Sequence, residues 1–148
     1  MTLHAAGYAP DPLGRDHVGM AQDVPATALL YDRDCGFCKW SLNRVLAWDR
    51  QRRLRPVAIQ SEEGERLLAA VEPARRLESW HLVLPGGEVR SGGAAFEPLG
   101  RLLPGGSPLA LFARTFPGLT DRLYRYVAGH RSRWARWLRI DAGCAVRR

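Results

Sequence analysis

The stretch that decides the fold spans residues 28–38 and reads ALLYDRDCGFC. Its apolar run, Ala28–Tyr31, is too short for a helix and suits a strand that is buried on both faces. Cys35 and Cys38 follow after a short turn. Apolar residues at helical spacing then predict a helix from Lys39 to Asp49. A strand, a turn that carries two cysteines and a helix therefore open the fold.

The later patterns extend this beginning to a whole α/β domain. They first predict a strand that starts at or just after Pro56 and a helix capped by Ser61 and ended by Pro73. A hairpin over residues 80–90 and a helix over residues 93–103 follow, and this helix starts late or kinks at Pro98. The last predicted elements are helical stretches over residues 109–112 and 119–137, the second interrupted near Gly129. This order predicts a mixed sheet flanked by helices with a helical C-terminal extension.

Length and composition predict one ordinary domain, because the chain has 148 residues of which 46% are hydrophobic. Residues 1–25 contain glycine and proline without an apolar period, which predicts a flexible N-terminal leader. Residues 26–106 form the predicted core. Residues 107–148 form a predicted basic helical extension that packs on this core.

The formal net charge is +7, from 22 basic against 15 acidic residues. Residues 114–148 account for this charge, because nine arginines face only Asp121 and Asp141 there. The rest of the chain is close to neutral, unlike a polycation that coats phosphate. We therefore expect no nucleic-acid partner.

The expected compartment is the cytoplasm. No apolar run approaches the roughly 18 to 20 residues that span a bilayer, and the N-terminus lacks the pattern of a signal peptide. Three cysteines are too few for a disulfide scaffold. In a reducing compartment, the close pair favours redox or metal chemistry over architecture.

The position of the C-x-x-C pair favours redox chemistry. Free backbone N–H groups and the helix dipole stabilise a negative charge at a helix start, so Cys35 should ionise more readily than an ordinary thiol. The thiolate is the attacking species in disulfide exchange. Cys38 lies close enough to resolve a mixed disulfide on Cys35, so the pair can cycle between dithiol and disulfide. No bound cofactor is required.

Two other interpretations of the pair stay open. The pair could be half of a zinc site, although the other candidate ligands form no second paired motif: Cys144, His4, His17, His81 and His130. The cysteines could also be ordinary buried residues. In either case the protein would be a binding module with non-catalytic or metal-holding cysteines, recruited through its basic helical tail.

Residues 31–38, Tyr-Asp-Arg-Asp-Cys-Gly-Phe-Cys, resemble the opening motif of the DCC family of thiol-disulfide oxidoreductases, which are thioredoxin-like. Three later features are similar to the family's pattern, namely residues 91–95, residues 124–131 and Cys144, so the resemblance covers about residues 28–144. It implies a thioredoxin-like fold with Cys35 and Cys38 as the redox pair. The implied substrate is a protein or small-molecule thiol or disulfide.

Two departures from the related patterns concern Arg33 and Ser79. Arg33 replaces a usual glycine, and it could be a harmless surface change or place a cation beside the thiolate. Thioredoxins place a cis-proline before the strand that faces the active site, and the hairpin register puts Ser79 there. We expect a trans peptide at this position, because a cis bond at a non-proline residue costs about 2.5 to 4 kcal/mol. We also expect weak reduction of a generic disulfide protein.

Further polar residues have a structural and a chemical interpretation. Asp32 or Asp34 could relay a proton from the resolving thiol, but the favoured interpretation is that Asp32 ends a strand and Asp34 caps the helix or turn. His81 is expected to be a satisfied core or edge histidine rather than a base, and His130 is treated with the same caution. Cys144 is interpreted as a bystander.

The arginines of the tail alternate with aromatic residues, a pattern that could lie on anionic lipid. The favoured interpretation is an amphipathic helix whose Trp134, Trp137 and Leu138 pack on the domain while the arginines stay in water. Only weak contact with an anionic membrane is therefore expected of this basic C-terminal helix.

Overall fold

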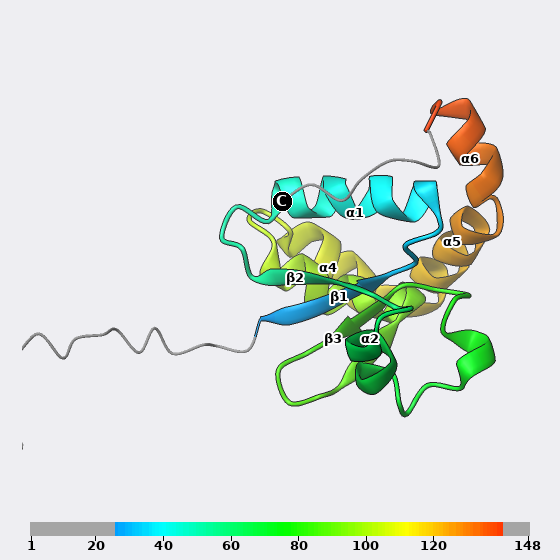
Figure 1. The fold of residues 1–148 in the computed structure, drawn as a ribbon. Helices are drawn as coiled ribbons and strands as arrows, with labels where there is room; N and C mark the ends of the chain where they lie inside the picture. The colour runs from blue at the N-terminus through cyan, green and yellow to red at the C-terminus, as the bar shows by residue number, and fades with distance from the viewer. Residues whose placement is uncertain (1–25, 141–148) are drawn as a thin grey trace, which may run out of the picture.

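The computed structural model describes residues 26–140, which contain one four-stranded sheet with helices on both faces (Figure 1). The strands run in the order β2-β1-β3-β4. β1 pairs parallel with β2, whereas the other two pairings are antiparallel. The strands comprise β1 (Thr27–Tyr31), β2 (Leu54–Ala58), β3 (His81–Val83) and β4 (Val89–Ser91). The predicted mixed sheet flanked by helices is confirmed.

β1 is buried on both faces as predicted, because apolar side chains cover it from two sides. β2 was predicted to start at or just after Pro56, which is wrong, since it already starts at Leu54. Pro56 pairs with Leu29 inside the strand. Proline is tolerated here because β2 is an edge strand, and the missing N–H can face away from its single neighbour.

Each face of the sheet has its own apolar core. α1 (Gly36–Trp48) and α3 (Phe96–Leu102) cover one face. The buried residues on this face are Leu29, Leu42, Leu46, Leu54, Leu82, Ala95, Leu99 and Leu103. α2 (Glu62–Leu67) lies against the other face, whose buried residues are Ala28, Leu30, Val57, Ile59, Leu68 and Val83. The two cores hold the carboxyl end of β1 and the start of α1 in a fixed relation.

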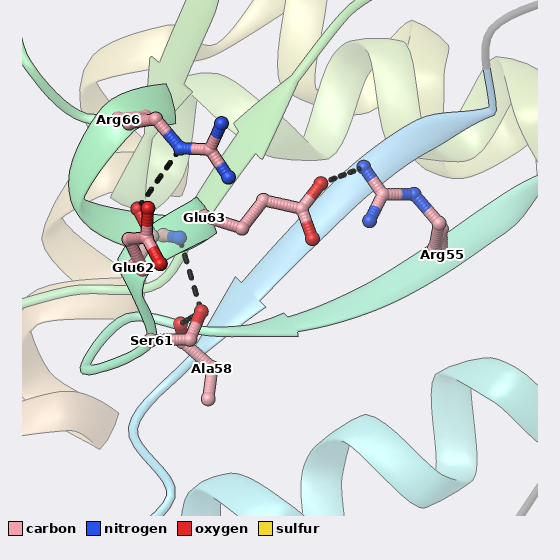
Figure 2. Close-up of polar contacts among 7 residues, drawn as sticks. Arg55, Ala58, Ser61, Glu62, Glu63 and Arg66 are labelled. Carbon is pink, nitrogen blue, oxygen red and sulfur yellow. Dashed lines mark hydrogen bonds and ion pairs between the residues drawn. The ribbon is translucent and has the colours of Figure 1, made fainter.

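α2 begins as predicted at a serine cap (Figure 2). The Ser61 hydroxyl accepts a hydrogen bond from the Gly64 amide at 3.0 Å and donates one to the Ala58 carbonyl at 2.7 Å. The predicted helix up to Pro73 is too long. α2 ends at Leu67, and Leu68 reaches the core from its C-cap position; a separate 3-10 turn, η1, covers Pro73–Arg75.

Replacing Ser61 by Ala should destabilise the fold by about 1 kcal/mol, because the first turn of α2 loses the acceptor for a backbone N–H. Urea unfolding of wild type and S61A measures this difference. Ser61→Thr keeps the hydroxyl and should lose clearly less. Equal losses in both variants would contradict a capping role.

Between β4 and residue 140 the chain forms helices joined by short turns. It comprises the 3-10 turn η2 (Gly92–Ala95), α3, α4 (Ser107–Thr115), α5 (Pro117–Gly129) and α6 (Arg131–Trp137). The late start at Pro98 is confirmed, since η2 precedes α3, and the interruption near Gly129 is the break between α5 and α6. Figure 1 shows α5 and α6 beside the end of α1 at which this helix begins, and α6 contacts α1. We call residues 117–137 the covering helices.

The tail packs less completely than predicted. Trp134 is half-buried and packs edge-on against Trp137, but Trp137 is 75% exposed, so its predicted burial is wrong. Arg133 and Arg136 are exposed, as predicted. None of the helices between residues 26 and 140 combines the length and the apolar character that a bilayer span requires.

Candidate active site

The two cysteines lie at the start of α1, directly after β1 and its turn. Cys35 is the N-cap residue of the helix, with extended backbone angles of φ −97° and ψ 110°. Its sulfur accepts a hydrogen bond from the Cys38 backbone amide, with 3.3 Å between Sγ and N. Both cysteines are half-buried and carry free thiols. Cys35 therefore occupies the position at which a helix stabilises a thiolate.

The environment of Cys35 lowers its pKa to about 6. The largest cause is a hydrogen bond from the Cys38 side chain, which favours the charged form, and the backbone hydrogen bond from Cys38 acts in the same direction. Burial and the Asp32 carboxylate oppose this shift, whereas the Arg131 guanidinium supports it. Cys35 is thus mostly thiolate at neutral pH.

The same environment raises the pKa of Cys38 far above that of an ordinary thiol. Its hydrogen bond to Cys35 is the largest cause, followed by burial and by the negative charge of Cys35. Cys38 therefore keeps its proton while Cys35 is ionised. One thiolate that holds one thiol by a hydrogen bond is the arrangement that exchange chemistry needs.

Arg131 is the site residue that sequence reasoning missed. It was placed on the solvated face of the tail, but it is half-buried at the start of α6, where its Nη1 donates to the Leu77 carbonyl at 3.4 Å. Its positive charge lowers the pKa of both thiols. The hydrogen bonds between the two thiols have a larger influence on these pKa values. The cation was expected to be Arg33, which is exposed. The tertiary structure, and not the local sequence around the cysteines, therefore brings a cation close to the thiols.

Replacing Arg131 by Gln should raise the pKa of Cys35, because a positive charge near the thiolate is removed while the hydrogen bonds from Cys38 remain. We expect alkylation of Cys35 at pH 6 to slow by about two- to threefold, a size typical of a partly solvated charge. Mass spectrometry after timed alkylation measures the rate. Arg133→Gln, at an exposed position of the same helix, is the matched control, and equal rates in both variants would contradict the assignment.

The turn before Cys35 is held by Gln60, which sequence reasoning also missed. Gln60 Nε2 donates to Asp32 Oδ1 at 2.6 Å and to Asp34 Oδ2 at 3.4 Å, and its Oε1 accepts from the Arg33 amide at 3.2 Å. Asp32 Oδ1 also accepts from the Asp34 amide at 2.9 Å. Gln60 follows β2, and the carboxyl ends of parallel strands meet at one edge, so its position was a usable signal.

The expected roles of the two aspartates are partly wrong. Asp32 follows the last residue of β1, as expected, and its carboxylate orders the turn. Asp34 does not cap the helix, because Cys35 occupies the N-cap and its sulfur takes the amide that a capping carboxylate would accept. The thiolate thus replaces the usual oxygen cap.

Ser79 lies two residues before β3 and lines the same cavity as Cys38. No cis peptide bond occurs between residues 26 and 140, so the expected trans peptide is confirmed. The Tyr124 hydroxyl accepts a hydrogen bond from the Trp80 amide at 3.1 Å. Burial raises the pKa of Tyr124, against the hydrogen bonds from Trp80 and Ser79. The Tyr124 side chain, from the covering helices, therefore already binds the Trp80 amide, which directly follows Ser79.

The expectation for His81 is confirmed. It is buried, with Nδ1 2.7 Å from Ser91 Oγ and Nε2 2.9 Å from the Arg76 carbonyl. His130 lies between α5 and α6, where its Nδ1 is 2.7 Å from the Tyr126 carbonyl. Cys144, His4 and His17 lie outside the described residues. Within residues 26–140, no three His, Cys, Asp or Glu side chains are grouped as metal ligands.

A cavity of about 390 Å³ adjoins the cysteine pair. Its wall includes Cys38, but most of it is apolar and comes from β1, α1, α3, α4 and the covering helices. Asp32 and Arg131 are the charged residues of this wall.

The chain has a mixed sheet, and its first strand leads into a helix capped by the first cysteine of a C-x-x-C pair. These features define a thioredoxin-like protein with a dithiol site. Residues 29–137 match the family model described as DCC1-like thiol-disulfide oxidoreductase, and the chain belongs to this family. The resemblance seen in the motif is thereby confirmed. No curated protein and no solved structure matches the chain significantly.

Proposed function

We propose that the protein is a thiol-disulfide oxidoreductase that cycles Cys35 and Cys38 between dithiol and disulfide. The observation that carries this proposal is the cap geometry, in which the Cys35 sulfur accepts the Cys38 amide at the start of α1. A structural cysteine pair has no need of one thiol with its pKa lowered to about 6 beside another with its pKa raised.

In the proposed cycle, Cys35 is the nucleophile and Cys38 is the resolving thiol. The Cys35 thiolate attacks one sulfur of a substrate disulfide; a mixed disulfide forms and the first substrate thiolate leaves. Cys38 then loses its proton and attacks Cys35 Sγ, which forms the protein disulfide and releases the second substrate thiol. The protein loses two electrons and the substrate gains them. A dithiol donor runs the same steps in reverse.

The residues around the pair have supporting roles in this proposal. Asp32 raises the pKa of both thiols by its negative charge, an influence that is smaller than that of the hydrogen bonds between the thiols. In this proposal, its carboxylate accepts the proton of Cys38. Asp34 and Arg33 take part through the turn that Gln60 holds. The proposed setting is the cytoplasm, where the thioredoxin and glutathione systems supply thiols.

Alkylation as a function of pH tests the proposal. The rate at Cys35 should rise through pH 6 and level off above it, since the thiolate fraction follows the pKa of about 6. Cys38 should react far more slowly at every pH. Thiol counts before and after mild oxidation should differ by the Cys35–Cys38 pair. A faster Cys38, or a Cys35 that titrates like an ordinary thiol, contradicts the proposal.

A further inference from the structure

The cavity beside Cys38 has the composition of a site for a small apolar molecule. Its volume of about 390 Å³ lies near the lower end of the roughly 300 to 1,000 Å³ of small-molecule pockets. Phe37, Trp80, Phe96, Leu123 and Val127 are among the residues that line it. Such a wall favours apolar surface, at about 25 cal/mol for each Å² removed from water.

The charged groups of the cavity gather at its cysteine end. Asp32 and Arg131 line the wall, and both are close enough to Cys35 and Cys38 to act on them electrostatically. The charges of Asp32 and Arg131 are opposite, and the Cys35 thiolate adds a negative charge, so this end disfavours an anion. An uncharged head at the thiols and an apolar body deeper in the cavity would match this distribution.

The covering helices occupy a backbone group with which a bound protein chain could pair. The Tyr124 hydroxyl holds the Trp80 amide, so a substrate backbone cannot pair there without displacing it. α5 cannot move away easily, because it packs on η2 at a glycine: a Cβ at Gly93 would lie 2.7 Å from the Asp121 amide nitrogen. At the far end of α5, Arg131 is tied to the Leu77 carbonyl.

We propose that the cavity binds the apolar substituent of a small, uncharged disulfide, and that such disulfides, rather than protein disulfides, exchange with the Cys35–Cys38 pair. This inference rests on the proposed function and names its substrate class. Cys35 forms a mixed disulfide with one half of the molecule, whose apolar group occupies the cavity, and the other half leaves as a thiol. Cys38 then displaces the bound half as a second thiol.

Two size-matched disulfides test the proposal. Dipropyl disulfide and bis(2-hydroxyethyl) disulfide differ only by a methyl in place of a hydroxyl at each end. Fully reduced full-length protein is mixed with each, and formation of the protein disulfide is followed by mass spectrometry. Each rate is divided by the rate of the same disulfide with dithiothreitol, which corrects for intrinsic reactivity. The corrected rate should be about tenfold or more higher for dipropyl disulfide.

Variants connect this preference to the cavity. Ala128→Phe adds a ring to the wall and should bring the corrected ratio of the two rates close to one. Ala47→Phe is the matched control, because Ala47 is exposed on α1 outside the cavity wall, and it should keep the wild-type ratio. Val127→Trp, at a position that is 36% exposed, fills the cavity from another residue if A128F does not fold. Circular dichroism verifies the fold of each variant.

The possible results separate the two proposals. Equal corrected rates in wild type, or a preference that both cavity-filling variants keep, overturn the cavity proposal and leave the exchange function standing. Absence of reaction with either disulfide overturns the substrate class proposed here, whereas the thiol counts before and after mild oxidation decide the exchange function. In that case binding of dipropyl disulfide to Cys35→Ser, observed by saturation-transfer NMR, decides the cavity on its own: a signal supports it, and no signal overturns it.

Discussion

Cys35→Ser should abolish disulfide exchange, whereas Cys38→Ser should stop it halfway, with a persistent mixed disulfide on Cys35. The first variant lacks the thiolate that attacks, and a serine hydroxyl does not ionise near neutral pH. The second keeps the nucleophile but lacks the thiol that resolves the intermediate. We expect a loss of at least about a thousandfold in turnover for each variant, as for other residues that act as a unit.

A comparison of two substitutions at Cys38 separates its two roles. Cys38→Ser keeps an O–H donor toward Cys35, whereas Cys38→Ala removes the side-chain hydrogen bond that is the largest cause of the low pKa of Cys35. Both variants should trap the mixed disulfide, but only C38A should markedly raise the pKa of Cys35, which alkylation as a function of pH measures. Continued turnover in either variant, or a trapped adduct on Cys38 of C35S, would reverse the assignment.

Gly93→Ala should be a strongly destabilising substitution outside the cysteine pair. The added Cβ would lie 2.7 Å from the Asp121 nitrogen and 2.8 Å from Asp121 Cβ, closer than the 3.0 Å that real Cβ atoms respect. The obstacle is the backbone of α5, which cannot rotate aside as a side chain can. The helix must shift from η2, at a cost of roughly 1 to 3 kcal/mol in the free energy of unfolding.

Gly118→Ala is the matched control for G93A. Gly118 lies in the first turn of α5, the helix on which η2 packs, and a Cβ there meets nothing within 4 Å. We expect this variant to be as stable as wild type or more stable by up to about 1 kcal/mol, since alanine favours the helix. Urea unfolding gives both values. The pKa of Cys35 should also rise in G93A alone, because the covering helices carry Arg131. Equal stability of the two variants would show that α5 does not pack as described.

The sequence was sufficient for the parts of the site that lie close together along the chain. The stretch from Ala28 to Cys38 predicted a strand, a turn and a helix, although the cap of that helix is Cys35 and not Asp34 as predicted. Gln60 could have been found, because it lies just after the strand that pairs parallel with β1. Tyr124 and Arg131 lie within residues 124–131, which the family resemblance covers, but the pattern of the basic tail did not indicate that they contact residues 44 and 54 positions earlier in the chain.

The sequence by itself determined the sheet, its helices and the identity of the cysteine pair, because strand and helix patterns and cap positions are local properties of neighbouring residues. Tertiary structure alone decided what surrounds the pair. Packing of α5 on η2 brought Tyr124 to the Trp80 amide, α6 brought Arg131 close to the thiols, and both helices contribute residues to the wall of the apolar cavity. Such contacts depend on shape complementarity between distant segments, which a residue pattern does not encode until the segments meet.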